Sequence, residues 1–114
     1  MSESLGERIR RKRMELRLGL RVTARRAGIS PTFLSRVEIG AEKAIPSEAV
    51  LQRLAELLED DLSELMALAG RIPRDVADYM KTDPKMPEFL RRARAKKISA
   101  EELIALLDKE QGGG

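Results

Sequence analysis

The sequence predicts an all-α fold, and three observations support this prediction. Apolar residues recur at the three- and four-residue spacing of a helix face, most clearly between residues 47 and 58. Serine or proline stands where several of these segments begin and glycine where several end, as is typical of helix starts and stops. The composition is 42% hydrophobic but only 3% aromatic, so we expect a helical core packed from Leu, Ile, Val and Ala.

The first 70 residues predict five helices, each with its own start or stop signal. The second and third are separated only by residues 28–30, and residues 40–46 are expected to form a loop before the fourth. In order, the helices are expected over 5–17, over 20–27, over 31–39 with Gly40 as its C-terminal cap, after Ser47, and between Asp60 or Asp61 and Gly70.

Residues 18–40 read as a helix-turn-helix, two helices joined by a tight turn. Gly28 stands where the turn needs a residue that tolerates positive φ. Ile29 is expected to fill the angle between the helices, and Ser30-Pro31 begins the second one as N-cap and first helical residue. Ala24 is small, as two steeply crossing helices require.

This part of the chain resembles the lambda-repressor-like (XRE) helix-turn-helix domain of bacterial and phage transcription regulators. The resemblance covers about residues 5–70 and rests on LGERIRRKRMEL (5–16), ARRAGIS (24–30), PTFLSRVEIG (31–40) and PSEAVLQRLAELL (46–58). It implies a five-helix all-α domain over residues 1–70 that inserts its third helix into the DNA major groove, usually as a homodimer. Residues 71–111 would then form a short C-terminal helical extension for dimerisation or partner binding, and 112–114 a flexible tail.

The resemblance also implies which residues contact double-stranded DNA. Base-edge readers are expected at the start of the 31–39 helix and one turn later, and phosphate contacts near the 20–27 helix start and in the loop after Gly40. Phe33 could pack on a thymine methyl or turn back onto the preceding helix. The expected contacts are Pro31, Thr32, Phe33, Ser35 and Arg36 on the recognition helix, with Arg21 and Lys43 on phosphates.

Arg13 and Glu38 match a pair that in the family joins the first helix to the end of the third. The resemblance implies a partly buried salt bridge with an architectural role. From the sequence alone, two solvated charges remain an alternative.

Several residues depart from the family's usual pattern. Arg17 and Glu59 stand where glycine is common, and Gly19 where Ser, Thr or Asn usually caps the second helix. Val22 and Ile39 replace polar residues that could have approached the DNA backbone. These changes bear on DNA affinity more than on fold.

Charge is distributed unevenly along the chain. Residues 1–45 hold 11 Lys and Arg against 5 Asp and Glu, a net +6, while residues 46–70 hold 1 against 6, a net −5. The positive charge therefore coincides with the helix-turn-helix, as phosphate binding requires.

The composition argues against several other classes of protein. The chain has no cysteine and no histidine, so disulfides and metal sites built from thiolate or imidazole ligands are excluded. With no glycine-rich phosphate loop either, we expect no enzyme, no cofactor and no metal. No apolar run reaches the ~18 residues of a membrane span, so we expect no membrane association and a cytoplasmic protein.

The extension predicts three more short helices, separated by Asp83-Pro84 and Pro87 and by Ser99, which opens a capping-box spacing with Glu102. Its apolar residues outnumber what three short helices can bury among themselves, which favours a partner surface. The basic run 91–97 fits a solvated helix face, a second DNA-backbone contact or a protein-partner surface. The residues expected to hold a dimer are Tyr79, Met80, Phe89, Leu90, Leu103 and Leu107.

These observations together favour a sequence-specific transcription regulator, a repressor that binds a palindromic operator as a homodimer. One alternative is the antitoxin of a toxin–antitoxin pair whose extension binds the toxin. Another is a protein-interaction module that kept the fold and lost tight DNA binding, as the apolar Val22 and Ile39 would allow.

Overall fold

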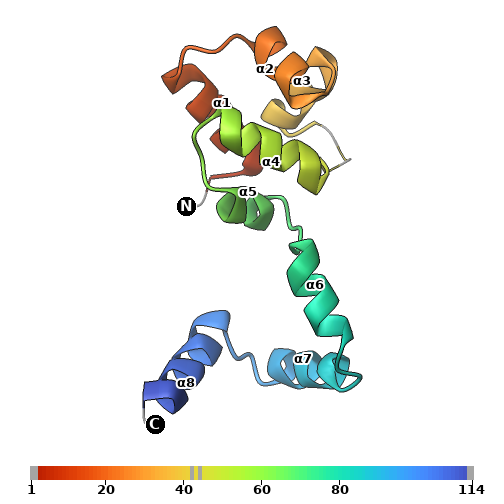
Figure 1. Cartoon of the computed structure of the whole chain (residues 1–114), viewed down its shortest axis with the longest axis vertical. Helices are drawn as coiled ribbons and strands as arrows, with labels where there is room; N and C mark the ends of the chain where they lie inside the picture. The colour runs from red at the N-terminus through yellow and green to blue at the C-terminus, as the bar shows by residue number, and fades with distance from the viewer. Residues whose placement is uncertain (1–2, 42, 44, 113–114) are drawn as a thin grey trace. The chain divides into compact units, whose positions relative to one another are not determined.

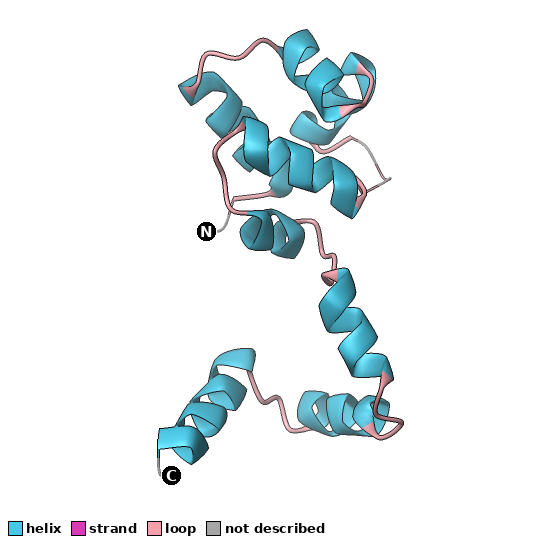
Figure 2. Ribbon diagram, viewed as in Figure 1, coloured by secondary structure: helices cyan, strands magenta, loops and turns pink. Residues whose placement is uncertain are grey.

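The computed structural model describes residues 3–41, 43 and 45–112. Within these ranges the chain forms eight α-helices and no β-strand, so the all-α prediction is confirmed (Figure 2). The chain divides into two compact units, Met1–Arg74 and Asp75–Gly114.

The first unit holds the helix-turn-helix. Helix α1 contacts α3, α2 contacts both α3 and α4, and α4 contacts α5 (Figure 1). The second and third helices have the bounds that the sequence predicts. The five helices of this unit are α1 (Leu5–Glu15), α2 (Leu20–Ala27), α3 (Pro31–Ile39), α4 (Glu48–Leu57) and α5 (Leu62–Leu68).

Four of these helices begin at a side-chain cap. The side chains of Ser4, Ser30, Ser47 and Asp61 each accept a hydrogen bond from the main-chain N–H three residues on. Such bonds satisfy donors that have no partner inside the helix. At α1 the cap is reciprocal, because the main-chain N–H of Ser4 donates to Glu7 at 3.1 Å.

The first helix ends earlier than the sequence predicts, and the backbone conformation at the helix ends explains why. Gly28 and Gly40 adopt the expected positive φ, 78° and 74°, after α2 and α3. Arg17 takes the same backbone conformation, with φ of 55°, so α1 ends at Glu15 and not at Arg17. The chain reverses there, and Leu18 packs against the core whereas Leu16 is exposed.

One core lies among the five helices of the first unit. It combines Ile9 of α1 with side chains from every other helix of the unit, and Ile29 packs against it from the turn as predicted. Ala24 is fully buried where the two helices of the motif meet. The remaining core residues are Ala27, Leu34, Val37, Leu51, Leu54, Ala55, Leu58, Leu65, Met66 and Ala69.

The second unit contains α6 (Arg74–Lys81, whose first residue belongs to the first unit), α7 (Met86–Ala95) and α8 (Ala100–Gly112). None of residues 75–109 is buried. Gly112, which the sequence assigned to a tail, is the last residue of α8, and residues 113–114 lie outside the described residues. In the described part of the chain, every helix is too short or too polar to cross a membrane.

Gly6 allows α1 and α3 to approach closely. A Cβ at this position would lie 2.2 Å from the carbonyl oxygen of Val37 and 2.6 Å from that of Glu38. These oxygens belong to the main chain of α3, so neither can move aside without shifting the helix. The absence of a side chain at residue 6 therefore fixes how near α3 lies to the start of α1.

Gly6→Ala should destabilise the protein by about 3 kcal/mol, the upper end of the usual cost of overpacking, because the added methyl meets the backbone of a second helix. Urea unfolding followed by circular dichroism measures the change. Gly19→Ala is the matched control, since a Cβ there has no atom within 4 Å, and its unfolding free energy should stay within about 1 kcal/mol of the unchanged protein. Equal effects at the two glycines would contradict the close approach.

Candidate nucleic-acid interface

Helix α3 has an inner face that packs into the unit and an outer face that is open. Leu34, Val37 and Glu38, at helical spacing, are buried. Thr32 and Arg36 are exposed, and Ser35 between them is half-buried. The structure thus brings three of the predicted base-reading residues together on one polar surface of a single helix.

The two other predicted DNA contacts on α3, Pro31 and Phe33, differ in their exposure. Pro31, the first helical residue, is exposed. Phe33 is half-buried and packs against the core, so its ring contributes to holding α3 in the unit. Ser30 caps this end, where its hydroxyl accepts from the main-chain N–H of Phe33 at 3.0 Å.

Helix α2 carries a row of cations beside α3. Arg21, Arg25 and Arg26 are all exposed, and no salt bridge between described residues includes any of them. Of these three, only Arg21 is among the phosphate contacts expected from the sequence. Arg25 stands four residues further on the same helix, so the spacing rule for helix faces could have found it. Lys43, in the loop after α3, is also exposed.

Arg13 and Glu38 form a two-pronged salt bridge between α1 and α3. The Arg13 Nε and Nη2 atoms lie 2.8 and 2.9 Å from the two carboxylate oxygens of Glu38. A third guanidinium nitrogen donates to the Leu18 carbonyl at 2.9 Å. The Glu38 carboxylate raises the pKa of Arg13 above its usual value. Glu38 has a side chain only 5% exposed, so this pair anchors the inner face of α3.

Other arginines of α1 are also engaged within the unit. The guanidinium of Arg8 donates to both carboxylate oxygens of Asp60, at 2.9 and 2.7 Å, and to Glu64 at 2.9 Å. Burial tends to raise the pKa of Asp60, but hydrogen bonds from Arg8 and from the main-chain N–H of Asp61 lower it overall. Arg11 pairs with Glu3 and Glu15. Part of the N-terminal positive charge is therefore paired with acidic groups inside the unit, and of these pairs the resemblance implied only Arg13–Glu38.

Two apolar residues lie at or near the candidate interface. Ile39, at the end of α3, is 67% exposed, and Val22 on α2 is 40% exposed. They stand where polar side chains would strengthen contact with a phosphate backbone.

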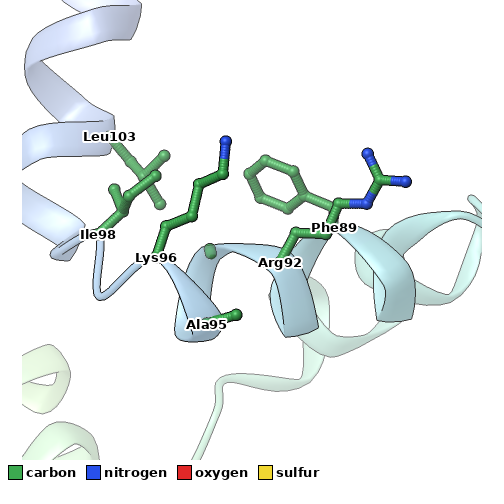
Figure 3. Close-up of a pocket in the computed structure, with 7 residues that line it drawn as sticks. Phe89, Arg92, Ala95, Lys96, Ile98 and Leu103 are labelled. Carbon is green, nitrogen blue, oxygen red and sulfur yellow. The ribbon is translucent and has the colours of Figure 1, made fainter.

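A second candidate surface lies in the unit of α6, α7 and α8. Tyr79 is 71% exposed, Phe89, Leu90 and Leu107 are also exposed, and Met80 and Leu103 are half-buried. A groove of about 430 Å³ lies between α7 and the start of α8, and its apolar wall includes Phe89, Ile98 and Leu103 (Figure 3). Arg92 and Lys96 line the same groove, so its rim is basic.

This arrangement, a capped α3 set across a tight turn from α2, defines a helix-turn-helix protein. The model of the helix-turn-helix domain family matches residues 4–77. The chain therefore belongs to the helix-turn-helix domain family, and its resemblance to XRE-type regulators is confirmed.

One known protein is similar to part of the chain in sequence, and another is similar to most of it in structure. The HTH-type transcriptional repressor RghR of Bacillus subtilis (strain 168) is 37% identical over 70 residues, 61% of this chain and 51% of the repressor. The chain thus spans about half the length of that relative. A chain of the SinR protein/SinI protein complex is 21% identical, with 94% of both chains covered and a TM-score of 0.49.

Removing one partner of the α1–α3 salt bridge should cost far more than removing a surface pair. Arg13→Met leaves the Glu38 carboxylate buried without its cation, and we expect a loss of about 3–5 kcal/mol of unfolding free energy. Replacing both residues, Arg13→Met with Glu38→Met, should recover most of that loss because no buried charge remains. Urea unfolding measures all three proteins.

Arg11→Met is the matched control, because Arg11 lies on the same helix and its pairs with Glu3 and Glu15 are largely exposed. Its cost should be about 1 kcal/mol or less. A double variant as unstable as Arg13→Met alone would show that the charge of Glu38 is not what makes the single variant unstable.

Proposed function

We propose that this protein is a sequence-specific, double-stranded-DNA-binding transcription regulator that acts as a repressor. It binds a palindromic operator as a homodimer through α3. The observation that carries the proposal is the open polar face of α3, where Thr32, Ser35 and Arg36 stand on a helix anchored by its opposite face. The same function is supported by membership of the helix-turn-helix domain family and by the similarity of part of this chain to a transcriptional repressor.

The proposed contacts fall into two kinds. Arg36 can donate two hydrogen bonds to guanine O6 and N7, and Thr32 can bond a base edge or touch a thymine methyl. Arg21 and Lys43 bind phosphates, and the exposed Arg25 and Arg26 add positive charge beside them. Phosphate contacts set the register of α3 in the groove, and base contacts give the sequence preference.

We further propose that α1–α5 form the DNA-binding domain and α6–α8 the dimerisation surface. None of residues 75–109 is buried, so the apolar side chains of α6–α8 lie at the surface, and exposed apolar patches often mark a partner surface. Dimerisation also serves recognition, because two half-sites one helical turn apart provide a specificity that one α3 cannot.

Charge favours a second copy of this chain as the partner. The basic run 91–97 contains five Lys and Arg on or just after α7, whereas α8 begins with Glu101 and Glu102 and carries Asp108 further along. The α8 of one protomer is thus complementary to the basic rim of the groove on the other, and its exposed Leu107 supplies an apolar contact. In a symmetric pair each chain both gives and receives this helix.

Arg36→Ala should remove discrimination at one guanine of each half-site and leave binding to unrelated duplexes largely intact. We expect the selected site to lose about 1–3 kcal/mol of binding free energy. Selection of bound duplexes from a random library identifies the site, and gel shifts with the selected and a scrambled duplex then compare the two proteins.

Arg10→Ala is the control, since Arg10 is an exposed arginine on α1, outside the proposed contacts. Equal losses on both duplexes would instead make Arg36 a phosphate contact. Binding that does not change between low and physiological salt would favour the protein-interaction module, which the exposed Ile39 and Val22 make a specific alternative.

Placing a charge in the proposed dimer surface should separate the protomers while the fold survives. Leu107→Glu and Phe89→Glu each put a carboxylate where the partner's apolar side chains would lie, and both residues are exposed in the single chain. We expect a shift from dimer to monomer in sedimentation velocity at micromolar concentration, with weaker operator binding.

Gln52→Glu is the control, because this exposed residue lies on α4 and adds the same charge elsewhere. A monomeric unchanged protein, or a Leu107→Glu variant that is still a dimer, would contradict the proposed surface.

A further inference from the structure

The loop that joins α3 to α4 carries one of the proposed phosphate contacts. It begins at Gly40, and its described residues include the exposed Lys43 and Ile45 and the buried Pro46. These described loop residues belong to neither helix, so helical hydrogen bonds do not set their position. A lysine in such a segment can reach a phosphate reproducibly only if other contacts hold the loop.

Arg71, three residues after the end of α5, supplies contacts of that kind. Its guanidinium donates to the Ile45 carbonyl at 2.8 Å and, through Nε, to the Pro46 carbonyl. Pro46 is buried, and a buried carbonyl without a partner is costly. One planar side chain therefore satisfies two consecutive carbonyls of the loop at once, which an ammonium group could not do in the same geometry.

Arg71 is itself held at a defined place. Its main-chain N–H donates to the Met66 carbonyl at 2.9 Å, across the turn where Gly70 has a φ of 69°. Three residues later the main-chain N–H of Arg74 donates to the Glu48 carboxylate at the start of α4, at 3.1 Å. Hydrogen bonds therefore fix the segment 71–74 to the first unit on both sides of Pro73. The backbone of Arg71 is held in place, so its side chain can hold the loop.

We infer that Arg71 is a positioning residue for DNA binding: it holds the α3–α4 loop so that Lys43 meets a phosphate of the backbone. The inference rests on the proposed function, because it requires that Lys43 contact DNA. In this proposal Arg71 acts through the loop and not as a further phosphate contact, since its Nε and Nη2 atoms donate to loop carbonyls. The loop is held by the two N–H groups of the planar guanidinium that donate to consecutive carbonyls (the guanidinium fork), and not by its charge.

The test is the salt dependence of binding to a short mixed-sequence duplex, which reports the number of neutralised phosphates. Lys43→Ala should lower the slope of log K against log salt by about 0.9 and weaken binding roughly five- to tenfold at 0.1 M salt. Arg71→Lys keeps the charge but loses the fork, and it should reproduce both changes. Arg71→Lys combined with Lys43→Ala should bind no more weakly than Lys43→Ala alone.

Arg10→Lys is the matched control, because it makes the same exchange at an exposed arginine of α1 outside the proposed contacts and should leave the slope unchanged. Thermal melts show that each variant is folded, and Arg71→Gln gives a second variant without the fork if Arg71→Lys does not fold. An Arg71→Lys protein that binds like the unchanged protein would overturn the inference, as would losses at residues 43 and 71 that add. If the unchanged protein shows no binding to any duplex, the proposed function fails first and this inference with it.

Discussion

The packing of α1 against α3 is the constraint on which the rest of the first unit depends. It is set at two separate points. At the start of α1, Gly6 lets the backbone pass against the carbonyls of Val37 and Glu38. Near its end, Arg13 binds the carboxylate of Glu38 and the Leu18 carbonyl. Because both points act on the last turns of α3, they determine which face of that helix packs inward and which faces outward.

This arrangement divides the arginines of the chain by role. Three of the four arginines of α1 pair with acidic groups within the unit, as Arg8 does with Asp60 and Arg13 does with Glu38. A buried ion pair contributes little net stability because both charges lose water, but it disfavours every arrangement that separates them. The arginines of α2 lie outside such pairs among the described residues. Local net charge in the sequence therefore overstates the charge available to a nucleic acid.

Sequence patterns predicted what is local and missed what is not. Gly28, Ser30-Pro31 and Gly40 mark the ends of α2 and α3 because caps and positive φ depend on neighbouring residues. The predicted end of α1 at Arg17 was wrong, because Arg17 adopts the left-handed conformation although it is not glycine. The roles of Gly6, Arg8 and Arg71 depend on partners from 25 to 56 residues away. No periodicity in one sequence encodes such pairings, so only the folded chain shows them.

The second unit raises a different physical question, because its helices are short and bury no residue between 75 and 109. Isolated helices shorter than about 12–15 residues are marginal in water, and most of their stability comes from packing of an apolar face. If a second copy covers these faces, as proposed, then dimerisation also stabilises the helices that perform it. Operator affinity would then depend on protein concentration twice, through pairing of the half-sites and through folding of the surface that pairs them.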